Sequence, residues 1–406
     1  MKILHWDEMF HPSFGYQINL LAKYQALQGH DVVIMTSDKI SEHPIFRDFV
    51  NDGDDVLAAD RKYEDDNSVK VMRLPIYGVV SGRAIYKPGF IKKIKEQQAD
   101  IIMCHTNDTL SSIIIAASHK IIKTPLVFDN HMLDMASHNK LNKLFYLFFK
   151  TFITPIYKSN QWIVFRTQDD PYVNKRLGIS LKQAPFLSFG SDVRLFHPDD
   201  AARKKFREEH SISQNAFVVV YAGKLTEAKG GLFLAEALKK RLVTNAELIF
   251  IIVGNAPPSL SEKIEQLFDT SENKIIRMHT QKYTELPLIY QAADLALYPK
   301  EVSLSFFDVQ ASGLPVVSSS NNINDERLSH GNGFTFPLND INEFRDRIKQ
   351  CIEMNPAAYS EMKTNSYRYV NDNYSYVSIA AQCTDVMQKE IDRQTSKTIL
   401  YRSAFL

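Results

Sequence analysis

Short apolar runs alternate with longer amphipathic stretches along almost the whole chain. After the first run comes a polar turn, and then Ile18, Leu21 and Ala22 stand at helical spacing. Runs that are apolar at consecutive positions are typical of strands buried on both faces of a parallel sheet. The pattern predicts strands over 2–6, 31–36, 69–74, 101–104, 126–128, 162–165 and 186–189, and in a second series over 217–222, 248–253, 275–278, 295–298 and 315–318.

The two series indicate two domains of an α/β protein. A chain of 406 residues is too long for one compact core. The break lies near 190–198, where a charged stretch begins, so we predict Rossmann-like domains over 1–190 and 191–373. The segment 48–68 is acidic, and we expect an irregular surface insertion there. Helices are expected over 232–240, 261–268, 284–293 and 341–354.

Composition narrows the class of protein. Hydrophobic residues make up 44% and charged residues 23%, which is ordinary for a globular protein, and the net charge of +1 gives no field that would select nucleic acid. Three widely spaced cysteines form no Cys-x-x-Cys pair, which fits a reducing compartment. No apolar run reaches the length of a membrane span and no signal peptide stands at the start, so we expect a cytoplasmic protein.

Ligands of such sheets bind beyond the carboxyl ends of the strands, so the turns there are the places to look for chemistry. Lys224 and Lys229 flank the turn between strand 217–222 and a helix that starts near Gly230. Cations beside a helix start suit a diphosphate, and they could neutralise charge on a departing nucleoside diphosphate. The alternative is a pair of solvated surface lysines.

A second turn follows strand 295–298. Asp308 lies at the start of the next helix, where its carboxylate could accept both hydroxyls of a ribose, or could stabilise the helix dipole alone. The residues before it, Ser303, Leu304 and Ser305, offer amides and hydroxyls to phosphate or sugar oxygens, although local capping explains the serines equally simply.

The first half offers weaker signals. Gly15, beside Tyr16, would allow close approach of a phosphate or would serve as an ordinary turn glycine. His131 follows strand 126–128 and could bond a sugar hydroxyl, or could be a structural histidine tied to a carbonyl, and His105 has the same standing. The paired aspartates at 52–54 lie in a polar stretch, so we predict no metal site.

The stretch 139–164 mixes basic and aromatic residues. Such a helix can lie on an anionic membrane surface, or it can face the core with its lysines outward. The mixture consists of Lys140, Lys143, Lys150 and Lys158 with Leu144, Phe145, Leu147, Phe148, Phe149 and Phe152.

Taken in order, these elements resemble glycosyltransferase family 4, with its two-domain GT-B fold, over nearly the whole length. The matching elements are Gly15-Tyr16-Gln17, Gly29-His30-Asp31-Val32, Ala99-Asp100-Ile101-Ile102 before His105, Phe189-Gly190-Ser191-Asp192, Lys224, Lys229-Gly230, Val253-Gly254-Asn255-Ala256-Pro257, Ala293-Asp294 and Gly313-Leu314-Pro315-Val316-Val317.

The resemblance implies two facing Rossmann-like domains with a cleft between them and a C-terminal helix, 374–406, that crosses back to the first. It implies metal-independent transfer of a hexosyl or N-acetylhexosaminyl group, with retention, from a nucleotide sugar, with UDP expected, and no further cofactor. The acceptor would be a hydroxyl of a surface glycan, glycolipid, lipid-linked oligosaccharide or glycopolymer. The implied catalytic residues are Lys224, Lys229 and His131, and the implied donor contacts are Gly15, Tyr16, Asn255, Glu301, Ser303, Leu304, Ser305 and Asp308.

One motif departs from the family pattern. Two glutamates separated by seven residues are expected before Gly313, but Lys300 and Asp308 stand at those positions, with Glu301 one place away. Two alternatives therefore stay open: a non-catalytic subunit that stabilises a partner transferase, and a nucleotide-sugar epimerase of the same fold.

Overall fold

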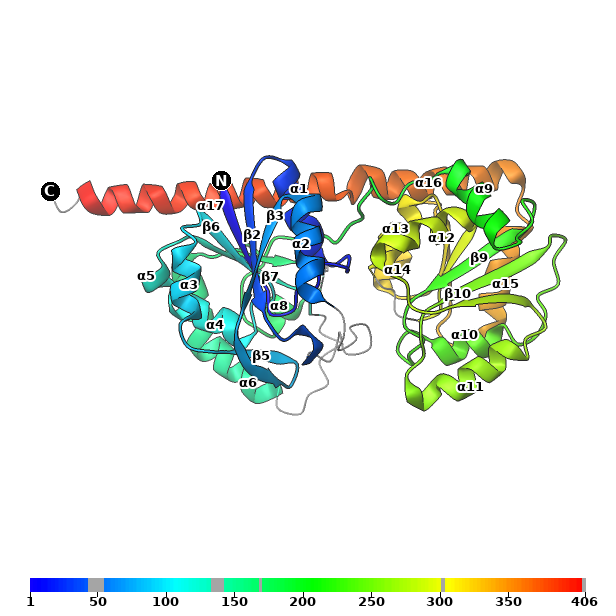
Figure 1. Ribbon diagram of the computed structural model, residues 1–406, viewed down its shortest axis with the longest axis horizontal. Helices are drawn as coiled ribbons and strands as arrows, with labels where there is room; N and C mark the ends of the chain where they lie inside the picture. Colours follow the sequence, from blue (N-terminus) through cyan, green and yellow to red (C-terminus); the bar gives the residue numbers. More distant parts are fainter. Residues whose placement is uncertain (43–54, 133–141, 168–169, 301–303, 404–406) are drawn as a thin grey trace. The chain divides into compact units, whose positions relative to one another are not determined.

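The computed structural model describes residues 1–42, 55–132, 142–167, 170–300 and 304–403. The chain forms two compact units, drawn in Figure 1. The N-terminal unit comprises Met1–Phe189 together with Tyr376–Leu406, and the C-terminal unit comprises Gly190–Ser375. The boundary predicted from the sequence, after residue 190, lies one residue later.

A six-stranded parallel sheet forms the centre of the N-terminal unit, in the order β3-β2-β1-β6-β7-β8. Its central strands are buried along their length because helices cover both faces. The strands are β1 (Lys2–Trp6), β2 (Asp31–Ser37), β3 (Val69–Leu74), β6 (Ile101–Cys104), β7 (Leu126–Asn130) and β8 (Val164–Arg166). The helices are α1 (Gln17–Leu27), α2 (Val56–Asn67), α3 (Phe90–Glu96), α4 (Leu110–Ala117), α5 (His119–Ile122), α6 (Asn142–Phe148), the π-helical η3 (Phe149–Ile153), α7 (Thr154–Asn160) and α8 (Tyr172–Lys175).

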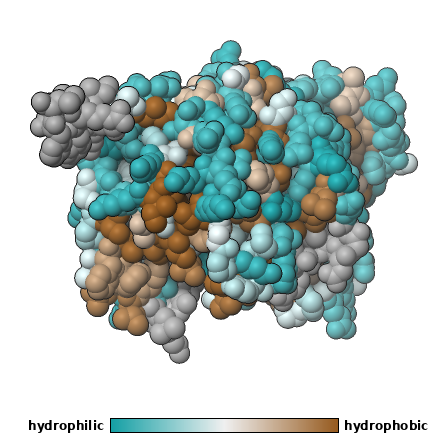
Figure 2. Space-filling view, turned by 60° about the vertical axis from the view of Figure 1, so that its left-hand side comes forward, coloured by the Kyte–Doolittle hydropathy of each residue, from teal (hydrophilic) through white to brown (hydrophobic). Residues whose placement is uncertain are grey.

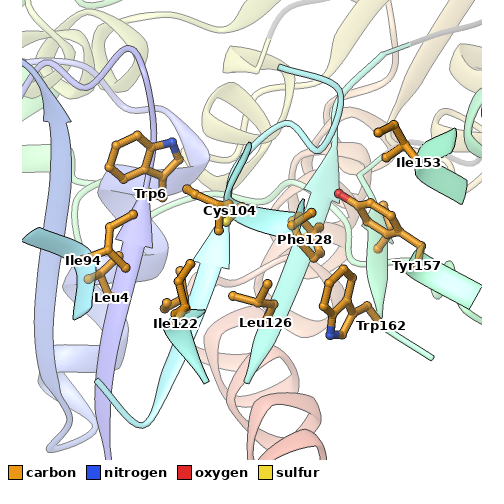
Figure 3. Close-up of a cluster of buried hydrophobic side chains, with 14 of the residues drawn as sticks. Leu4, Trp6, Ile94, Cys104, Ile122, Leu126, Phe128, Ile153, Tyr157 and Trp162 are labelled. Carbon is orange, nitrogen blue, oxygen red and sulfur yellow. The ribbon is translucent and has the colours of Figure 1, made fainter. Parts of the chain in front are cut away.

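The core of this unit lies against the sheet. Figure 3 shows Tyr157 and Trp162 beside Phe128 of β7, with ring centroids 4.7 and 5.5 Å from that of Phe128. Trp6 of β1 packs on Tyr86, at 4.7 Å, and its indole N–H donates to Ser111 Oγ at 2.9 Å. The apolar strands therefore bury their side chains and leave the polar residues for the strand ends.

The C-terminal unit repeats the plan with the strand order β11-β10-β9-β12-β13-β14, again all parallel. The predicted pair of Rossmann-like sheets is thus confirmed. The strands are β9 (Phe217–Ala222), β10 (Leu248–Val253), β11 (Lys274–Met278), β12 (Leu295–Tyr298), β13 (Val316–Ser319) and β14 (Gly333–Phe336). The helices are α9 (Asp200–Glu209), α10 (Gly231–Ala237), α11 (Pro258–Asp269), α12 (Leu286–Ala292), α13 (Ser305–Ala311), α14 (Asn322–Arg327), α15 (Ile341–Ile352) and α16 (Pro356–Asn373).

The last helix, α17 (Tyr376–Ser403), belongs to the N-terminal unit and packs on α1. The rings of Tyr24 and Tyr376 stack with centroids 6.5 Å apart, and Gln28 Nε2 donates to Val377 O at 3.1 Å.

Two expectations from the sequence are wrong. Residues 186–189 are not a strand, because only Phe186 forms an isolated bridge, to Arg166, before the chain enters the C-terminal unit. The part of 48–68 from Val56 onward is helix α2, and residues 43–54 lie outside the described residues. The helix is anchored by Asp60, which forms a buried ion pair with Arg73 at 2.6 Å, and by Tyr63, whose hydroxyl donates to Asn19 O at 2.6 Å.

Two turns at the carboxyl edge of the C-terminal sheet approach each other so closely that only glycine fits. Gly254 has φ +125°, and a Cβ there would lie 2.0 Å from the carbonyl oxygen of Gly223. Gly29, which ends α1, has φ +88° and open space around its Cβ position.

We predict that Gly254→Ala lowers the free energy of unfolding by at least about 3 kcal/mol, because backbone strain and a backbone clash add together. Gly29→Ala is the matched control and should cost only about 1 kcal/mol, since it carries the strain without the clash. Urea unfolding of both variants measures the difference, and equal losses would contradict the close approach.

Candidate active site

Three turns are tied together at the carboxyl edge of the C-terminal sheet. Leu225 N donates to Asn255 O at 3.0 Å, which joins the turn after β9 to the turn after β10. Gly254 N donates to Met278 O at 3.0 Å, which joins that turn to the end of β11. The sequence therefore builds a continuous backbone rim where it was expected to place its binding residues.

Lys224 and Lys229 are half-buried on this rim. Tyr221 fixes the first of them through a hydrogen bond from its hydroxyl to Lys224 O at 2.8 Å, and Lys229 N donates to Thr226 Oγ1 at 3.3 Å. The side chain of a third lysine reaches the same turn, because a Cβ built on Gly230 would lie 3.0 Å from Lys300 Cγ. The rim thus gathers positive charge, which suits a phosphate group. The spacing in the sequence predicted Lys224 and Lys229, whereas the position of Lys300 at this turn becomes apparent only in the folded structure.

Asp308 lies on α13 and is buried. Its Oδ1 accepts from Ser191 Oγ at 2.7 Å and from the Tyr283 hydroxyl at 3.5 Å. Burial raises the pKa of this carboxyl to about 8, with the nearby Asp192 adding to the rise and the two hydrogen bonds opposing it. The group is therefore largely protonated at neutral pH and is tied to the segment that opens this unit. A ribose bound here would have to share a carboxyl that already accepts hydrogen bonds from Ser191 and Tyr283.

The other expected donor contacts occupy the same edge. Asn255 is exposed, its Oδ1 accepts from Thr280 N at 3.3 Å, and it lies 3.2 Å from His279 Nδ1. Ser305 begins α13 with its Oγ 3.0 Å from the Tyr298 hydroxyl. Asn255 helps to line a cavity of about 520 Å³, the rest of whose lining is Ala256, Ser261, Glu265, Arg277, Met278 and His279.

The residues before α13 are described only in part. Leu304 is half-buried directly before the helix, and its carbonyl accepts from Phe307 N at 3.2 Å. Glu301 and Ser303 lie outside the described residues. The roles of all three in donor binding stay predictions.

In the N-terminal unit, Gly15 and Tyr16 form the turn before α1. The Tyr16 ring stacks on Phe14 with centroids 5.5 Å apart. Next to them, both amide atoms of Gln17 are buried without a hydrogen-bond partner among the described residues. Such orphaned groups mark places where a ligand or water completes the hydrogen bonding. Unpaired polar atoms thus lie next to the glycine turn, while the donor contacts of Gly15 and Tyr16 stay predictions.

His131 lies just beyond β7, with 34% of its side chain exposed. Its Nε2 is 3.2 Å from Asp129 Oδ1, close enough for an ion pair, and its ring meets Phe189 edge to face at 5.3 Å. Burial opposes protonation of His131, but the interaction with Asp129 and the charges of Asp7 and Asp108 together outweigh it and raise the pKa of the imidazole. The histidine is thus held by a carboxylate rather than by a carbonyl.

The sequence analysis missed Asp7, which follows β1 and faces the same edge. Its Oδ1 accepts from Met9 N at 2.7 Å, and burial raises the pKa of its carboxyl while the nearby His105 opposes the rise. A buried carboxyl with a raised pKa at a strand end is a candidate functional group. The signal was an acid directly after the first buried strand.

Among the described residues, His105, Asp129 and His131 bring ligand atoms within 4.8 Å of one another, as a metal site would. However, His105 Nδ1 lies only 2.6 Å from Asp129 Oδ2. Two ligands on one zinc, each about 2 Å from the ion, would stand about 3.3 Å apart. His105 and Asp129 are therefore arranged as hydrogen-bonding partners.

Comparisons with known proteins agree with this geometry. Residues 216–354, which hold the lysine rim, match the family model described as Glycosyl transferases group 1. The chain is 25% identical over 273 residues to the UDP-Gal:alpha-D-GlcNAc-diphosphoundecaprenol alpha-1,3-galactosyltransferase of Escherichia coli, covering 64% of this chain and 68% of that protein.

Two solved structures share the fold over 96% of this chain. A glycosyltransferase from Rickettsia africae superposes with a TM-score of 0.72 at 14% identity, with 98% of its own chain covered. Anabaena HepE in complex with UDP and glucose superposes with a TM-score of 0.69 at 18% identity, with its whole chain covered.

The raised pKa of Asp308 predicts a pH-dependent stability. The folded state holds the proton up to about pH 8 while the unfolded chain releases it near pH 4, so this carboxyl stabilises the fold fully only below about pH 4. That contribution is lost as the pH rises from about 4 to 8. Asp308→Asn removes the effect, so the variant should gain stability relative to wild type across this window. Urea unfolding at several pH values measures it, and a difference that does not change with pH would contradict the assignment.

Proposed function

We propose that this chain, a group 1 glycosyltransferase with the GT-B fold, moves a sugar from a UDP-sugar to an acceptor hydroxyl with retention of configuration and without a metal ion. The observation that carries the proposal is the cluster of Lys224, Lys229 and Lys300 on the rim of the C-terminal sheet, inside the segment that the family model matches. The choice of uridine is supported by HepE, solved with UDP, and by the Escherichia coli relative, which is named for UDP-Gal.

In this reaction the bond between the anomeric carbon and the diphosphate oxygen breaks, and UDP leaves with the electron pair. Of the rim lysines, Lys224 and Lys229 neutralise the charge that develops on UDP. The acceptor oxygen bonds to the anomeric carbon on the face that UDP leaves, and its proton passes to the departing phosphate. His131 contacts the donor sugar with the exposed part of its ring.

A lipid-linked acceptor fits a surface of the N-terminal unit. The relative acts on a diphosphoundecaprenol-linked sugar by its name. On α6 and η3, Leu144, Leu147, Phe148 and Phe152 are exposed, Leu144 by 68% and Phe152 by 61%. Figure 2, in which this unit comes forward, shows hydrophobic side chains gathered low on its face.

Basic residues adjoin this apolar surface. A cavity of about 270 Å³ is lined by Lys143, Lys150, Lys175 and Arg176 together with Tyr146 and Leu147. Apolar side chains with neighbouring cations suit the interface of an anionic membrane. Within the described residues no helix is long and apolar enough to cross a membrane. We therefore propose peripheral contact at the membrane face that carries the acceptor.

Replacing one rim lysine tests the reaction. Lys229→Ala should lower kcat at least about 100-fold, because charge on the leaving diphosphate loses its neutralising partner. Lys239→Ala, at an exposed lysine of the same unit, is the matched control and should stay within about twofold. Transfer is followed by UDP release with a lipid-linked acceptor. Wild-type turnover in Lys229→Ala would remove this lysine from the mechanism.

Vesicle sedimentation tests the membrane surface. The double variant Phe148→Ser and Phe152→Ser should bind anionic phospholipid vesicles at least about tenfold more weakly, since two apolar side chains no longer enter the lipid. Leu57→Ser, at an exposed leucine on α2, serves as control. Unchanged binding in the double variant would show that the protein meets lipid elsewhere or not at all.

A further inference from the structure

A chain of buried polar side chains runs through the N-terminal unit and ends at His131. Gln25 Oε1 of α1 lies 2.7 Å from His5 Nε2 of β1, and His5 Nδ1 lies 3.0 Å from His105 Nε2. His105 Nδ1 lies 2.6 Å from Asp129 Oδ2, and Asp129 Oδ1 lies 3.2 Å from His131 Nε2. All of these residues except His131 are at most 2% exposed.

The inner end of the chain is anchored in the last helix. Gln25 Nε2 lies 3.5 Å from Thr384 Oγ1 and 3.7 Å from Met387 Sδ, both on α17. The outer end is the ring of His131, whose Nε2 is buried and lies 3.2 Å from Asp129 Oδ1 as an ion-pair contact, without a well-aligned hydrogen bond to the described residues, although a third of the side chain is exposed. The open part of the ring is therefore the part away from Asp129.

The direction of one hydrogen bond in this chain is fixed by chemistry. A carboxylate can only accept, and the charges of His105 and His131 outweigh burial and hold the pKa of Asp129 well below its usual range. His105 must therefore donate to it from Nδ1. Burial, helped by the charge of His105, lowers the pKa of His5 to about 3, so His5 is neutral and joins Gln25 to His105 with one nitrogen donating and one accepting.

We propose that His105 is a positioning residue: by donating to Asp129 from Nδ1 it holds the carboxylate beside Nε2 of His131, and its contact with His5 holds the His105 ring in the orientation that makes that bond. This role rests on the proposed contact between His131 and the donor sugar. Burying polar side chains is costly unless they are bonded, and replacing buried ion pairs by well-packed apolar residues is often neutral or stabilising. The one partly exposed member is the residue placed to touch substrate.

Other charged groups face His131 as well. Asp7, after β1, and Asp108, before α4, both add negative charge near the ring, while His105 lies after β6 with its ring centroid 6.5 Å away. The charges of Asp7 and Asp108 add to that of Asp129 in raising the pKa of His131, but they do not decide which of its two nitrogens keeps the proton. Asp129 decides this, because its Oδ1 lies 3.2 Å from Nε2. Neutral His131 should therefore be the Nε2–H tautomer.

Two substitutions of His105 separate its bond to Asp129 from its bond to His5. In His105→Asn the amide N–H₂ replaces Nδ1, keeps the donor to Asp129 and cuts the bond to His5. In His105→Gln the longer side chain puts its amide near the place of Nε2 and leaves Asp129 Oδ2 without that donor. We expect His105→Asn to keep kcat within about threefold and His105→Gln to lose about 10- to 100-fold, as for lost orienting partners of other histidines. The affinity for UDP alone should not change in either.

The imidazole nitrogen shifts of His131, measured by NMR on the whole protein above its titration, test the chain without turnover. Wild type and His105→Asn should show the Nε2–H tautomer, and His105→Gln should show a mixture. An Nδ1–H tautomer in wild type, or equal kcat values for the two variants, would overturn the proposal even if one variant folds poorly. If the wild-type protein transfers no sugar, the proposed function fails, but the tautomer of His131 still tests the positioning role of His105.

Discussion

Burial of parallel strands on both faces is the constraint on which the structure depends. Strands such as β1 and β9 satisfy their backbone groups within the sheet and bury nearly every side chain, so polar chemistry is confined to the strand ends. The carboxyl ends then carry the residues that are proposed to meet the donor. Asp7 follows β1, His131 follows β7 and Lys224 follows β9. The same topology, repeated twice, supplies one unit with a histidine and carboxylates and the other with lysines.

Ionisable groups buried at those edges follow two different patterns. Asp129 stays ionised, because two imidazoles outweigh the cost of its burial. Asp308 accepts from two hydroxyl groups, and burial, helped by the charge of Asp192, raises its pKa although both hydrogen bonds oppose the rise. The surroundings of Asp129 suit a fixed negative charge that orients His131. Those of Asp308 suit a protonated carboxyl that can exchange its hydrogen-bond partners. The replacement of two expected glutamates by Lys300 and Asp308 therefore makes this edge less acidic than the family pattern would have it.

Much of the fold could be predicted because continuous apolar runs identify buried strands directly. The misses have physical causes. The sequence of α2 is strongly acidic, so its pattern does not show that Asp60 and Tyr63 are buried. Their partners, Arg73 and Asn19, lie elsewhere in the chain. β14 is short and begins with a glycine, so nothing in its pattern marks a strand. The lysine pair could be found because its members lie five positions apart, whereas the bond between Ser191 and Asp308 joins residues 117 positions apart. Contacts at such separation follow from the fold and not from local pattern.

The central claim is that the lysine rim of the C-terminal unit binds a nucleoside diphosphate. Calorimetric titration of the whole protein with UDP and with UMP tests it most directly, because the two ligands differ only in the phosphate that the lysines would meet. The account predicts that UDP binds at least about tenfold more tightly, as expected for added charge-assisted hydrogen bonds. Equal affinities, or no binding of UDP, would contradict it.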